Sequence, residues 1–268
     1  FTWEDFIALC QEVQEKDLVE WGMVHRPGKG NDFLDVLRMY GPAYYNEEEK
    51  LVVNQETVTG FFQFIYDAAN TLKISPLDTT QRVWTDLQKM VGEGDVFAYY
   101  GPVFSSTYVA AEANMTPEEL AQSIGFALFP KSEKNETPFS VAAPQSVSVN
   151  ANTEYPEVCK ALLEEVYAGE AVKDLAVHGD TIFSLTAVKA ANEMEEITTN
   201  PILESIGYMA DYVVTTPPIE GESVFRDELF KQLVLLELGQ VTPEKAFEDF
   251  KTQVELNVDE DEVVFELN

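Results

Sequence analysis

Residues 91–102 restrict the possible fold of this chain more than any other stretch. Their sequence, Val-Gly-Glu-Gly-Asp-Val-Phe-Ala-Tyr-Tyr-Gly-Pro, follows a run of helical periodicity over residues 80–90. Two closely spaced glycines predict a tight turn, and the apolar residues after them predict a short buried strand that ends at Gly101-Pro102. Because such an ending brings bare backbone to the surface, we expect a ledge on which a small molecule rests. No nucleophile or metal-ligand cluster is adjacent in the sequence, so the stretch indicates a binding site in preference to an active site.

The charge balance excludes several classes of partner. The sequence has 48 acidic and 17 basic residues, a formal net charge of −31, and such a field repels nucleic acid. The acidic residues are interpreted as a solvated surface, because no Asp-x-Asp-x-Asp-Gly calcium loop is present. His25 and His178 lack the spacing of zinc ligands. We therefore expect no metal and no cofactor. Separately, a hydrophobic content of 45% predicts an ordered globular chain.

Apolar periodicity predicts an α/β protein with a partly parallel sheet. Cys10 and Cys159 fall at apolar helix positions and are expected to be separate, with a disulfide as the alternative. Every expected strand lies before residue 150. Helices are expected over residues 2–15, 31–41, 57–72, 80–91, 156–167, 203–212, 225–238 and 242–256, with a further helix start at the capping box 116–119, and strands near 21–24, 47–53, 96–100, 124–130 and 141–149.

The order of these elements resembles that of the carbohydrate-type extracellular solute-binding proteins of ABC importers, the maltose-binding-protein-like group. The resemblance extends over nearly the whole chain. It departs from the family after Gly-Pro, where the frequent aromatic residue is Val103 here and Phe104 follows. Four segments carry the resemblance: Thr-Trp-Glu-Asp-Phe at 2–6, the stretch 90–102, Gly-Phe-Ala-Leu-Phe-Pro at 125–130, and Leu-Gly-Gln-Val-Thr-Pro-Glu-Lys-Ala-Phe at 238–247.

The resemblance implies a type II periplasmic-binding-protein-like fold, in which two lobes joined by hinge strands close around a ligand. Residues 1–140 would then be the first part of the carboxyl-terminal lobe. Residues 141–214 would be the return segment that belongs to the amino-terminal lobe. Residues 215–268 would hold the second hinge crossing, the closing helices of the carboxyl-terminal lobe and an acidic tail. Much of the amino-terminal lobe is expected to be missing, so that the chain starts in the middle of the fold.

The resemblance also implies a function without catalysis. The protein would capture a sugar or oligosaccharide outside the membrane, at the cell surface or in the periplasm, and deliver it to the transmembrane subunits of an ABC permease. A missing amino-terminal segment would anchor it to the membrane, and the missing amino-terminal lobe, or its equivalent, would be a further partner.

Two alternatives use the same fold. One is a secreted or surface carbohydrate-active enzyme, although no carboxylate pair is singled out by its surroundings and Gly-x-Ser-x-Gly is absent. The other is an extracellular scaffold or interaction protein without transport. Its signature would be the tail at 262–267, which is either a strand added to a neighbour's sheet or a frayed end.

Candidate ligand contacts gather first around the Gly-Pro ledge. Sugars present apolar faces and rings of hydroxyls, so their sites combine aromatic platforms with a few polar groups. Phe104 is the leading platform candidate, and Tyr100 is the member of the Tyr-Tyr pair expected to face inward. Gly101 and Pro102 supply the ledge itself. The alternative for Phe104 is simple packing.

A second set of candidates lies at two other positions. Arg26 and Asn31 flank a glycine-rich loop after the strand at 21–24, where open α/β folds bind ligands, although such a loop is equally consistent with solvent-exposed cover. The resemblance implies contacts from the start of the long helix after the second hinge, where Glu220, Phe225 and Arg226 stand. The guanidinium fork of arginine suits vicinal hydroxyls or a carboxylate. The alternative for Phe225 is core packing.

Overall fold

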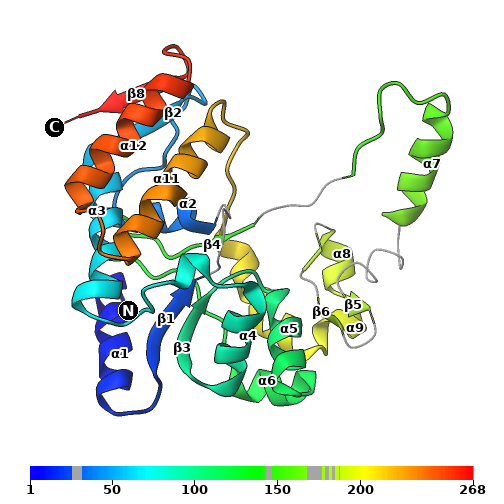
Figure 1. Ribbon diagram of the computed structural model, residues 1–268. Helices are drawn as coiled ribbons and strands as arrows, with labels where there is room; N and C mark the ends of the chain where they lie inside the picture. Colours follow the sequence, from blue (N-terminus) through cyan, green and yellow to red (C-terminus); the bar gives the residue numbers. More distant parts are fainter. Residues whose placement is uncertain are drawn as a thin grey trace. The chain divides into compact units, whose positions relative to one another are not determined.

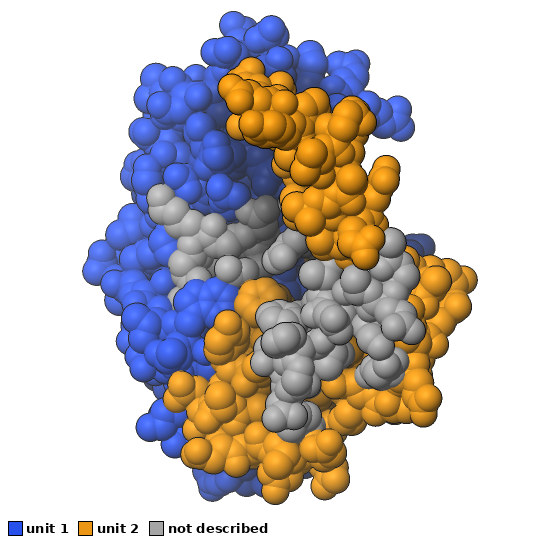
Figure 2. Space-filling model, turned by 90° about the vertical axis from the view of Figure 1, so that its right-hand side faces the viewer, with its two compact units in different colours: residues 1–101, 129–139, 216–268 blue, residues 102–128, 140–215 orange. Residues whose placement is uncertain are grey.

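The computed structural model describes residues 1–25, 32–142, 147–167, 177–178, 181–182, 185–186 and 188–267. These residues form two compact units (Figure 2). Unit 1 consists of residues 1–101, 129–139 and 216–268, and unit 2 of residues 102–128 and 140–215. The sequence-based division grouped residues 102–128 with the first segment, whereas here they cluster with 140–215. Which lobe of the family fold each unit corresponds to stays a prediction.

Unit 1 contains the longest helices and the best-formed strand pairs (Figure 1). Its helices are α1 (Trp3–Glu15), α2 (Asp32–Val36), α3 (Gln55–Tyr66), α4 (Trp84–Glu93), α11 (Glu222–Glu237) and α12 (Pro243–Asn257), with shorter turns at Leu37–Met39, Asp67–Thr71 and Thr79–Gln81. Its strands are β1 (Trp21–His25), β2 (Leu51–Asn54), β3 (Val96–Tyr100) and β8 (Val263–Glu266).

Local sequence signals explain where these helices begin and end. Thr2 and Asp5 form a reciprocal capping box, in which the Thr2 hydroxyl accepts from the Asp5 N–H and the Asp5 carboxylate accepts from the Thr2 N–H. Thr242 caps α12 and is followed by a proline at the first helical position. Helix α4 ends at Gly94, which adopts a left-handed φ of 82° that glycine reaches without strain. The tight turn predicted before the strand at 96–100 is confirmed.

The strand pairs of unit 1 are parallel. β1 pairs with β3, with Trp21 opposite Val96 and His25 opposite Tyr100. β2 pairs with β8, with Leu51 opposite Val263. The carboxyl-terminal tail is therefore neither a frayed end nor a free strand, because it closes onto β2 of the same chain. The expectation that every strand precedes residue 150 is also wrong, since strands of two to four residues leave no alternating pattern in the sequence.

The core of unit 1 is aromatic. In Figure 1, α3, α11 and α12 lie side by side, and five phenylalanines from these helices are fully buried. The Phe250 ring meets Phe225 at 5.0 Å and Phe62 at 6.0 Å between centroids, both edge to face. A smaller apolar cluster joins β1, α4 and β3 through Val24, Leu87 and Val96. Together these contacts fix the two parallel strands β1 and β3 against the helices.

Unit 2 is built from shorter elements. Its helices are α5 (Ser105–Ala113), α6 (Pro117–Ser123), α7 (Pro156–Val166), α8 (Lys189–Asn192), α9 (Glu195–Thr198) and α10 (Pro201–Ile206), followed by a 3-10 segment at Gly207–Tyr212. Its strands form two pairs of two residues each: β4 (Ser140–Val141) runs parallel to β7 (Val213–Val214), and β5 (Val177–His178) runs antiparallel to β6 (Thr181–Ile182). The strand expected at 124–130 is reduced to one bridge between Phe129 and Phe139, which belong to unit 1.

Burial in unit 2 is sparse and aliphatic. None of its aromatic side chains that the structure describes is buried. The α7 helix buries no side chain at all. The hydrophobic residues that unit 2 does bury, within the described ranges, are Val109, Ala110, Leu120, Ala191, Ile197, Ile202, Leu203 and Ile206.

Candidate functional site

The carboxyl ends of β1 and β3 meet at one edge of unit 1, because the two strands are parallel and in register. His25 and Tyr100 stand opposite each other there. Each is the last residue of its strand, and glycines occur within the next few residues of the sequence after each of them. Open α/β folds bind ligands at this edge. We call the group formed by His25, Asp35, Tyr99, Tyr100 and Gly101 the β1–β3 edge.

Tyr100 is half-buried and held on two sides. Its hydroxyl donates to the Asp35 carboxylate at 3.2 Å, and Asp35 itself is buried. The Tyr100 ring meets the Phe129 ring edge to face at 4.8 Å, and Phe129 stacks on Phe139 at 5.0 Å. A phenol fixed in this way offers an aromatic surface together with a hydrogen-bonding group in a set orientation.

Gly101 is required by its neighbour. A Cβ placed there would lie 2.5 Å from Cζ of the Tyr99 ring, closer than real Cβ atoms approach other heavy atoms. The bare backbone predicted at this position therefore has a packing reason, whatever its role toward a ligand. Pro102 and Phe104 follow in unit 2, where both are half-buried just before α5.

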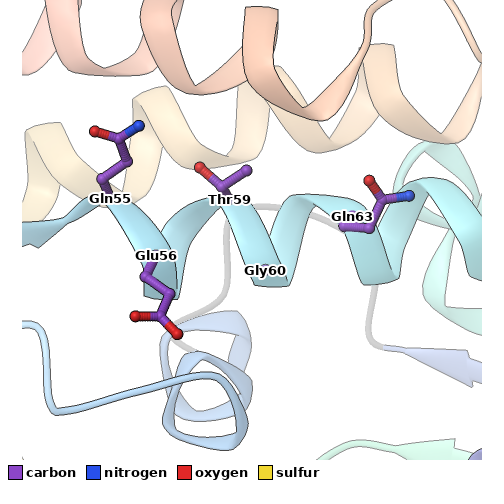
Figure 3. A pocket seen from close by; sticks show the side chains of 5 residues that line it. All are labelled: Gln55, Glu56, Thr59, Gly60 and Gln63. Atoms are coloured by element: carbon purple, nitrogen blue, oxygen red, sulfur yellow. The ribbon is translucent and has the colours of Figure 1, made fainter. Parts of the chain in front are cut away.

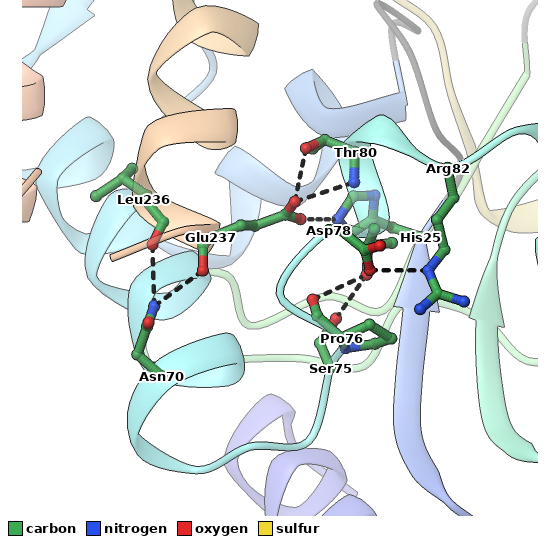
Figure 4. Close-up of polar contacts among 10 residues, drawn as sticks. His25, Asn70, Ser75, Pro76, Asp78, Thr80, Arg82, Leu236 and Glu237 are labelled. Carbon is green, nitrogen blue, oxygen red and sulfur yellow. Dashed lines mark hydrogen bonds and ion pairs between the residues drawn. The ribbon is translucent and has the colours of Figure 1, made fainter. Parts of the chain in front are cut away.

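His25, one member of the edge, also belongs to a buried polar cluster (Figure 4). Nε2 of His25 is 2.8 Å from Oε1 of Glu237, the last residue of α11. Oε2 of Glu237 accepts from the N–H of Thr80 at 3.0 Å and from its hydroxyl at 2.6 Å. Glu237 is 2% exposed, so its carboxylate depends on these donors in place of water. Because a carboxylate only accepts hydrogen bonds, His25 donates to it through Nε2.

The same cluster fixes the end of α11. The side-chain amide of Asn70 donates to the main-chain carbonyl of Leu236 at 2.9 Å and to that of Glu237 at 3.3 Å (Figure 4). Carbonyls in the last turn of a helix lack partners within the regular helix. Asn70 donates to that of Glu237 and is a second donor to that of Leu236, which also accepts from the Gly239 N–H at 3.0 Å. These hydrogen bonds join the end of α11 to His25 of β1, to Thr80 and to Asn70.

Sequence reasoning missed Glu237 and Asp35. Glu237 follows Leu233 by four residues, on the face of α11 that apolar periodicity assigns to the core. A charged residue at a core position is a signal of a buried polar contact, and it was available in the sequence. Asp35 gives no comparable signal.

The remaining predicted contacts are dispersed. Arg26 and Asn31 lie outside the described residues. Glu220 is exposed. Phe225 offers no surface to a ligand, because its ring is fully buried between Tyr44, stacked at 5.6 Å, and Phe250. The alternative of core packing therefore describes Phe225 in this structure, and the prediction of ligand contact is corrected accordingly.

Arg226 sits one turn into α11. Its Nη1 is 3.9 Å from Oε1 of Glu222, and its side chain is partly buried. Burial raises the pKa of Glu222 above its ordinary value, and the neighbouring guanidinium of Arg226 opposes this shift. Arg226 thus already lies near a carboxylate of its own helix, and an arginine in such a pair is less available to a ligand.

Two surface hollows lie away from the predicted contacts. One, of about 400 Å³, follows α3 and is lined by Gln55, Glu56, Thr59, Gly60 and Gln63. Figure 3 shows that Glu56 points away from Gln55 and Thr59, so these side chains do not converge on one point. The other, of about 370 Å³, is lined by Trp21, Ala69, Asn70, Lys73, Ser75 and Leu77.

Three further observations concern chemistry and membranes. Within the described ranges, no three His, Cys, Asp or Glu side chains are grouped so that they could hold a metal ion. None of the helices that the structure describes is long and apolar enough to span a bilayer. Cys10 is buried and Cys159 half-buried, and both are free thiols, so the expectation of separate cysteines is confirmed.

Comparison with known proteins identifies the fold. The sequence matches the family model of bacterial extracellular solute-binding proteins over residues 2–205. No curated protein matches it. The maltose/maltodextrin-binding domain MalE of Bdellovibrio bacteriovorus, bound to maltotriose, superposes with a TM-score of 0.71 at 19% identity, covering 95% of this chain and 66% of its own.

Two other solved structures agree. Maltose-bound MalE3 of T. maritima has a TM-score of 0.72 at 15% identity, over 95% of this chain and 65% of its own. A sugar transporter of Arthrobacter chlorophenolicus A6 with bound laminaribiose has a TM-score of 0.75 at 14% identity, over 97% of this chain and 65% of its own. The chain thus spans just under two thirds of the length of each of these structures. At such identities the likeness shows the fold: mixed α/β, of the MalE-like type II periplasmic-binding class.

Proposed function

Because the chain belongs to the family of bacterial extracellular solute-binding proteins, we propose that it captures a sugar or an oligosaccharide and hands it to the transmembrane subunits of an ABC permease. The observation that carries the proposal is the β1–β3 edge. There an oriented Tyr100 and a buried Asp35 carboxylate stand at the carboxyl ends of two parallel strands.

The chemistry of this edge suits a saccharide. The apolar face of a sugar ring packs on an aromatic surface, while its hydroxyls require fixed donors and acceptors. Tyr100 supplies the first, and its hydroxyl with the Asp35 carboxylate supplies the second. Gly101 keeps the adjacent backbone clear of a side chain. The contacts predicted from Arg26, Asn31, Pro102, Phe104, Glu220 and Arg226 stay part of the proposal.

The proposed work is transport, not catalysis. A binding protein of this kind acts through the difference in its affinity for a solute between two conformations, which needs no reacting group. The extracellular location follows from the family. Anchoring to the membrane and docking to a permease rest on the family resemblance and are proposed with it.

The test is a thermal-shift and calorimetric screen of the protein against maltose, maltotriose, laminaribiose and tagatose, with leucine and a dipeptide as non-sugar probes. A saturating ligand raises the unfolding free energy by about 2.7 kcal/mol at one hundred times its Kd. We expect one saccharide to give a saturable shift. Saturation by the amino acid or the dipeptide with no response to any saccharide would contradict the sugar assignment.

A pair of variants locates the site. Tyr100→Ala should abolish the sugar response, because it removes both the aromatic surface and the hydroxyl. Phe97→Ala is the matched control, since Phe97 is an exposed aromatic residue on the same strand whose side chain points to the opposite face. Equal affinities of the two variants would remove the β1–β3 edge from the proposal while leaving sugar binding intact.

A further inference from the structure

The hollow of about 370 Å³ takes no part in the proposed function. It lies at the amino end of β1, where Trp21 is the first residue of the strand. His25 of the β1–β3 edge follows four residues later, about 13 Å further along the strand. A small ligand in this hollow would therefore lie apart from a solute at the edge. We call it the β1 hollow, and its lining residues are Trp21, Ala69, Asn70, Lys73, Ser75 and Leu77.

The turn that forms one side of the β1 hollow has an unusual main chain. Helix α3 continues into a π-helical turn at Asp67–Thr71, in which the N–H of Leu72 donates to the Asp67 carbonyl at 2.7 Å. Lys73 follows with a left-handed φ of 55°, a conformation that disfavours residues other than glycine. Both features are frequent at functional sites. Because this turn supplies Ala69, Asn70 and Lys73 to the hollow, its geometry points to a role for the hollow.

Hydrogen bonds from several elements hold this turn in place. The N–H of Ile74 donates to the Ala68 carbonyl at 2.8 Å. The side-chain amide of Gln14, in α1, donates to the Lys73 carbonyl at 3.1 Å. Asn70 donates to carbonyls at the end of α11 (Figure 4). A ligand in the β1 hollow would therefore meet groups whose main chain is already fixed, which reduces the entropy lost on binding.

Polar groups of the β1 hollow are open to a ligand. Neither the indole N–H of Trp21 nor the ammonium of Lys73 has a hydrogen-bond or ion-pair partner among the residues that the structure describes. Asn70 directs its NH₂ group to main-chain carbonyls, which leaves its Oδ1 as an acceptor. Most lysines and arginines in the described ranges lie within 4.0 Å of a carboxylate. An unpaired lysine beside an open indole N–H is therefore a place where an anionic group can be held.

The rest of the lining suits a flat apolar ring. Trp21 is anchored on the apolar cluster of β1, α4 and β3 and keeps part of its ring exposed, while Leu77 is 51% exposed. Aromatic rings stack on such a surface, and hydrogen bonds to an ionised carboxylate are stronger than those between neutral groups. A sugar fits less well, because its several hydroxyls would find few acceptors here and burying them unpaired costs free energy.

We propose that the β1 hollow binds a small aromatic carboxylate, with its ring on Trp21 and its carboxylate on the Lys73 ammonium. The net charge of −31 disfavours anions over the surface as a whole, so the ligand's carboxylate depends on Lys73. The inference does not rest on the proposed function, and it stands whether or not the β1–β3 edge binds a sugar.

The test is a titration with benzoate, followed by the NMR signals of the indole N–H groups. The Trp21 signal, assigned by its absence in Trp21→Phe, should shift and saturate. The Trp3 indole donates to the Tyr40 hydroxyl at 2.8 Å, so its signal should stay in place. Benzyl alcohol, which lacks the charge, should bind at least about tenfold more weakly. No saturable shift of the Trp21 signal up to about 10 mM benzoate would overturn the proposal. Saturation by glucuronate in place of benzoate would also overturn it, in favour of a sugar acid.

Substitutions of two lysines make the test specific. Lys73→Met removes the ammonium but keeps an unbranched side chain, and should weaken benzoate binding by about tenfold or more. Lys131→Met is the matched control, since Lys131 is an exposed lysine of unit 1 that has no ion pair within the described residues either. Lys73→Arg retains the charge and should restore most of the affinity, which separates a lost charge from a damaged turn. Equal affinities of Lys73→Met and Lys131→Met would overturn the proposal.

Discussion

Unit 1 and unit 2 have similar kinds of side chain but bury them very differently. Unit 1 encloses five phenylalanines completely, whereas the described aromatic residues of unit 2 all keep exposed surface. The helices show the same contrast: α11 buries Phe225, Leu229, Leu233 and Leu236 along one face, and α7 buries nothing. Both helices are amphipathic enough to be recognised in sequence. An apolar face predicts that a helix makes a contact, but the sequence pattern does not identify the residues that it contacts.

The largest expected difference in unfolding free energy is between the truncation of a buried side chain in unit 1 and that of an exposed side chain in unit 2. Phe250→Ala removes a fully buried ring that meets Phe62 and Phe225, and should cost about 3–5 kcal/mol of unfolding free energy. Leu162→Ala removes an exposed side chain of α7 and should cost less than about 0.5 kcal/mol in residues 1–268. Urea denaturation of both variants measures the difference. Similar midpoints for the two would mean that the contrast between the units does not exist in solution.

Breaking the buried polar cluster should have the next largest effect. Glu237→Ala removes the buried carboxylate to which His25 and Thr80 donate and should cost about 3 kcal/mol. Glu204→Ala, at an exposed position of α10 in unit 2, is the control and should be nearly neutral. Glu237→Gln keeps an acceptor oxygen and should fall between them. If Glu237→Ala unfolds at the same urea concentration as the control, the cluster contributes no stability.

Substitution of one glycine in each unit should give a smaller difference in stability of the same kind. Gly101→Ala pushes a methyl group into the Tyr99 ring and should cost about 2 kcal/mol, since the ring must move. Gly125→Ala, in unit 2, meets no atom within 4 Å and should change stability by less than about 0.5 kcal/mol. Thermal unfolding of the two variants is sufficient. A destabilised Gly125→Ala would reveal packing in unit 2 that this structure does not show.

Alkaline pH should destabilise unit 1 selectively. Burial raises the pKa of the Cys10 thiol to about 12 and that of the Tyr44 hydroxyl to about 12. Burial also raises the pKa of Tyr40 above its ordinary range. All three groups stay neutral in the folded state but ionise in the unfolded state, so stability is complete below the unfolded pKa values and falls as the pH rises above 9.

At pH 10, one unit above the ordinary pKa of cysteine, the raised pKa of Cys10 alone should lower the free energy of unfolding by about 1.4 kcal/mol. The measurement is urea denaturation at pH 8, 9 and 10, with alkylation of the thiols by iodoacetamide under native conditions. Cys159, which is half-buried, should react well before Cys10. A stability that is flat from pH 8 to pH 10 would contradict this account.

Local signals in the sequence were sufficient for most helices of unit 1 and for the turn at Gly94. The Thr2 and Thr242 caps and the proline after Thr242 determine helix starts through contacts within three residues. The family and its α/β fold were also recognisable, because four short segments occur in the order of the family.

What the sequence could not give depends on long-range partners. His25 and Glu237 are 212 positions apart, and no local pattern pairs them. The tail strand β8 was visible as an apolar segment, but its partner β2 was not. A phenylalanine at a helix start, such as Phe225, gives the same sequence pattern whether its ring contacts a ligand or another core side chain such as Phe250. Residues whose roles are set by a neighbour far along the chain are therefore those for which site prediction was incomplete or wrong.

The parallel pairing of β2 with β8 has a consequence for biosynthesis. Phe61 and Phe62 of α3 leave the ribosome long before α11, α12 and β8 exist to cover them. The core of unit 1 therefore cannot close before residues 216–268 have been synthesised, and all of unit 2 precedes those residues in the sequence. Contacts between residues so far apart also slow folding. Until α11, α12 and β8 have been synthesised, the apolar side chains of α3 stay uncovered, and exposed apolar surface of this kind favours aggregation.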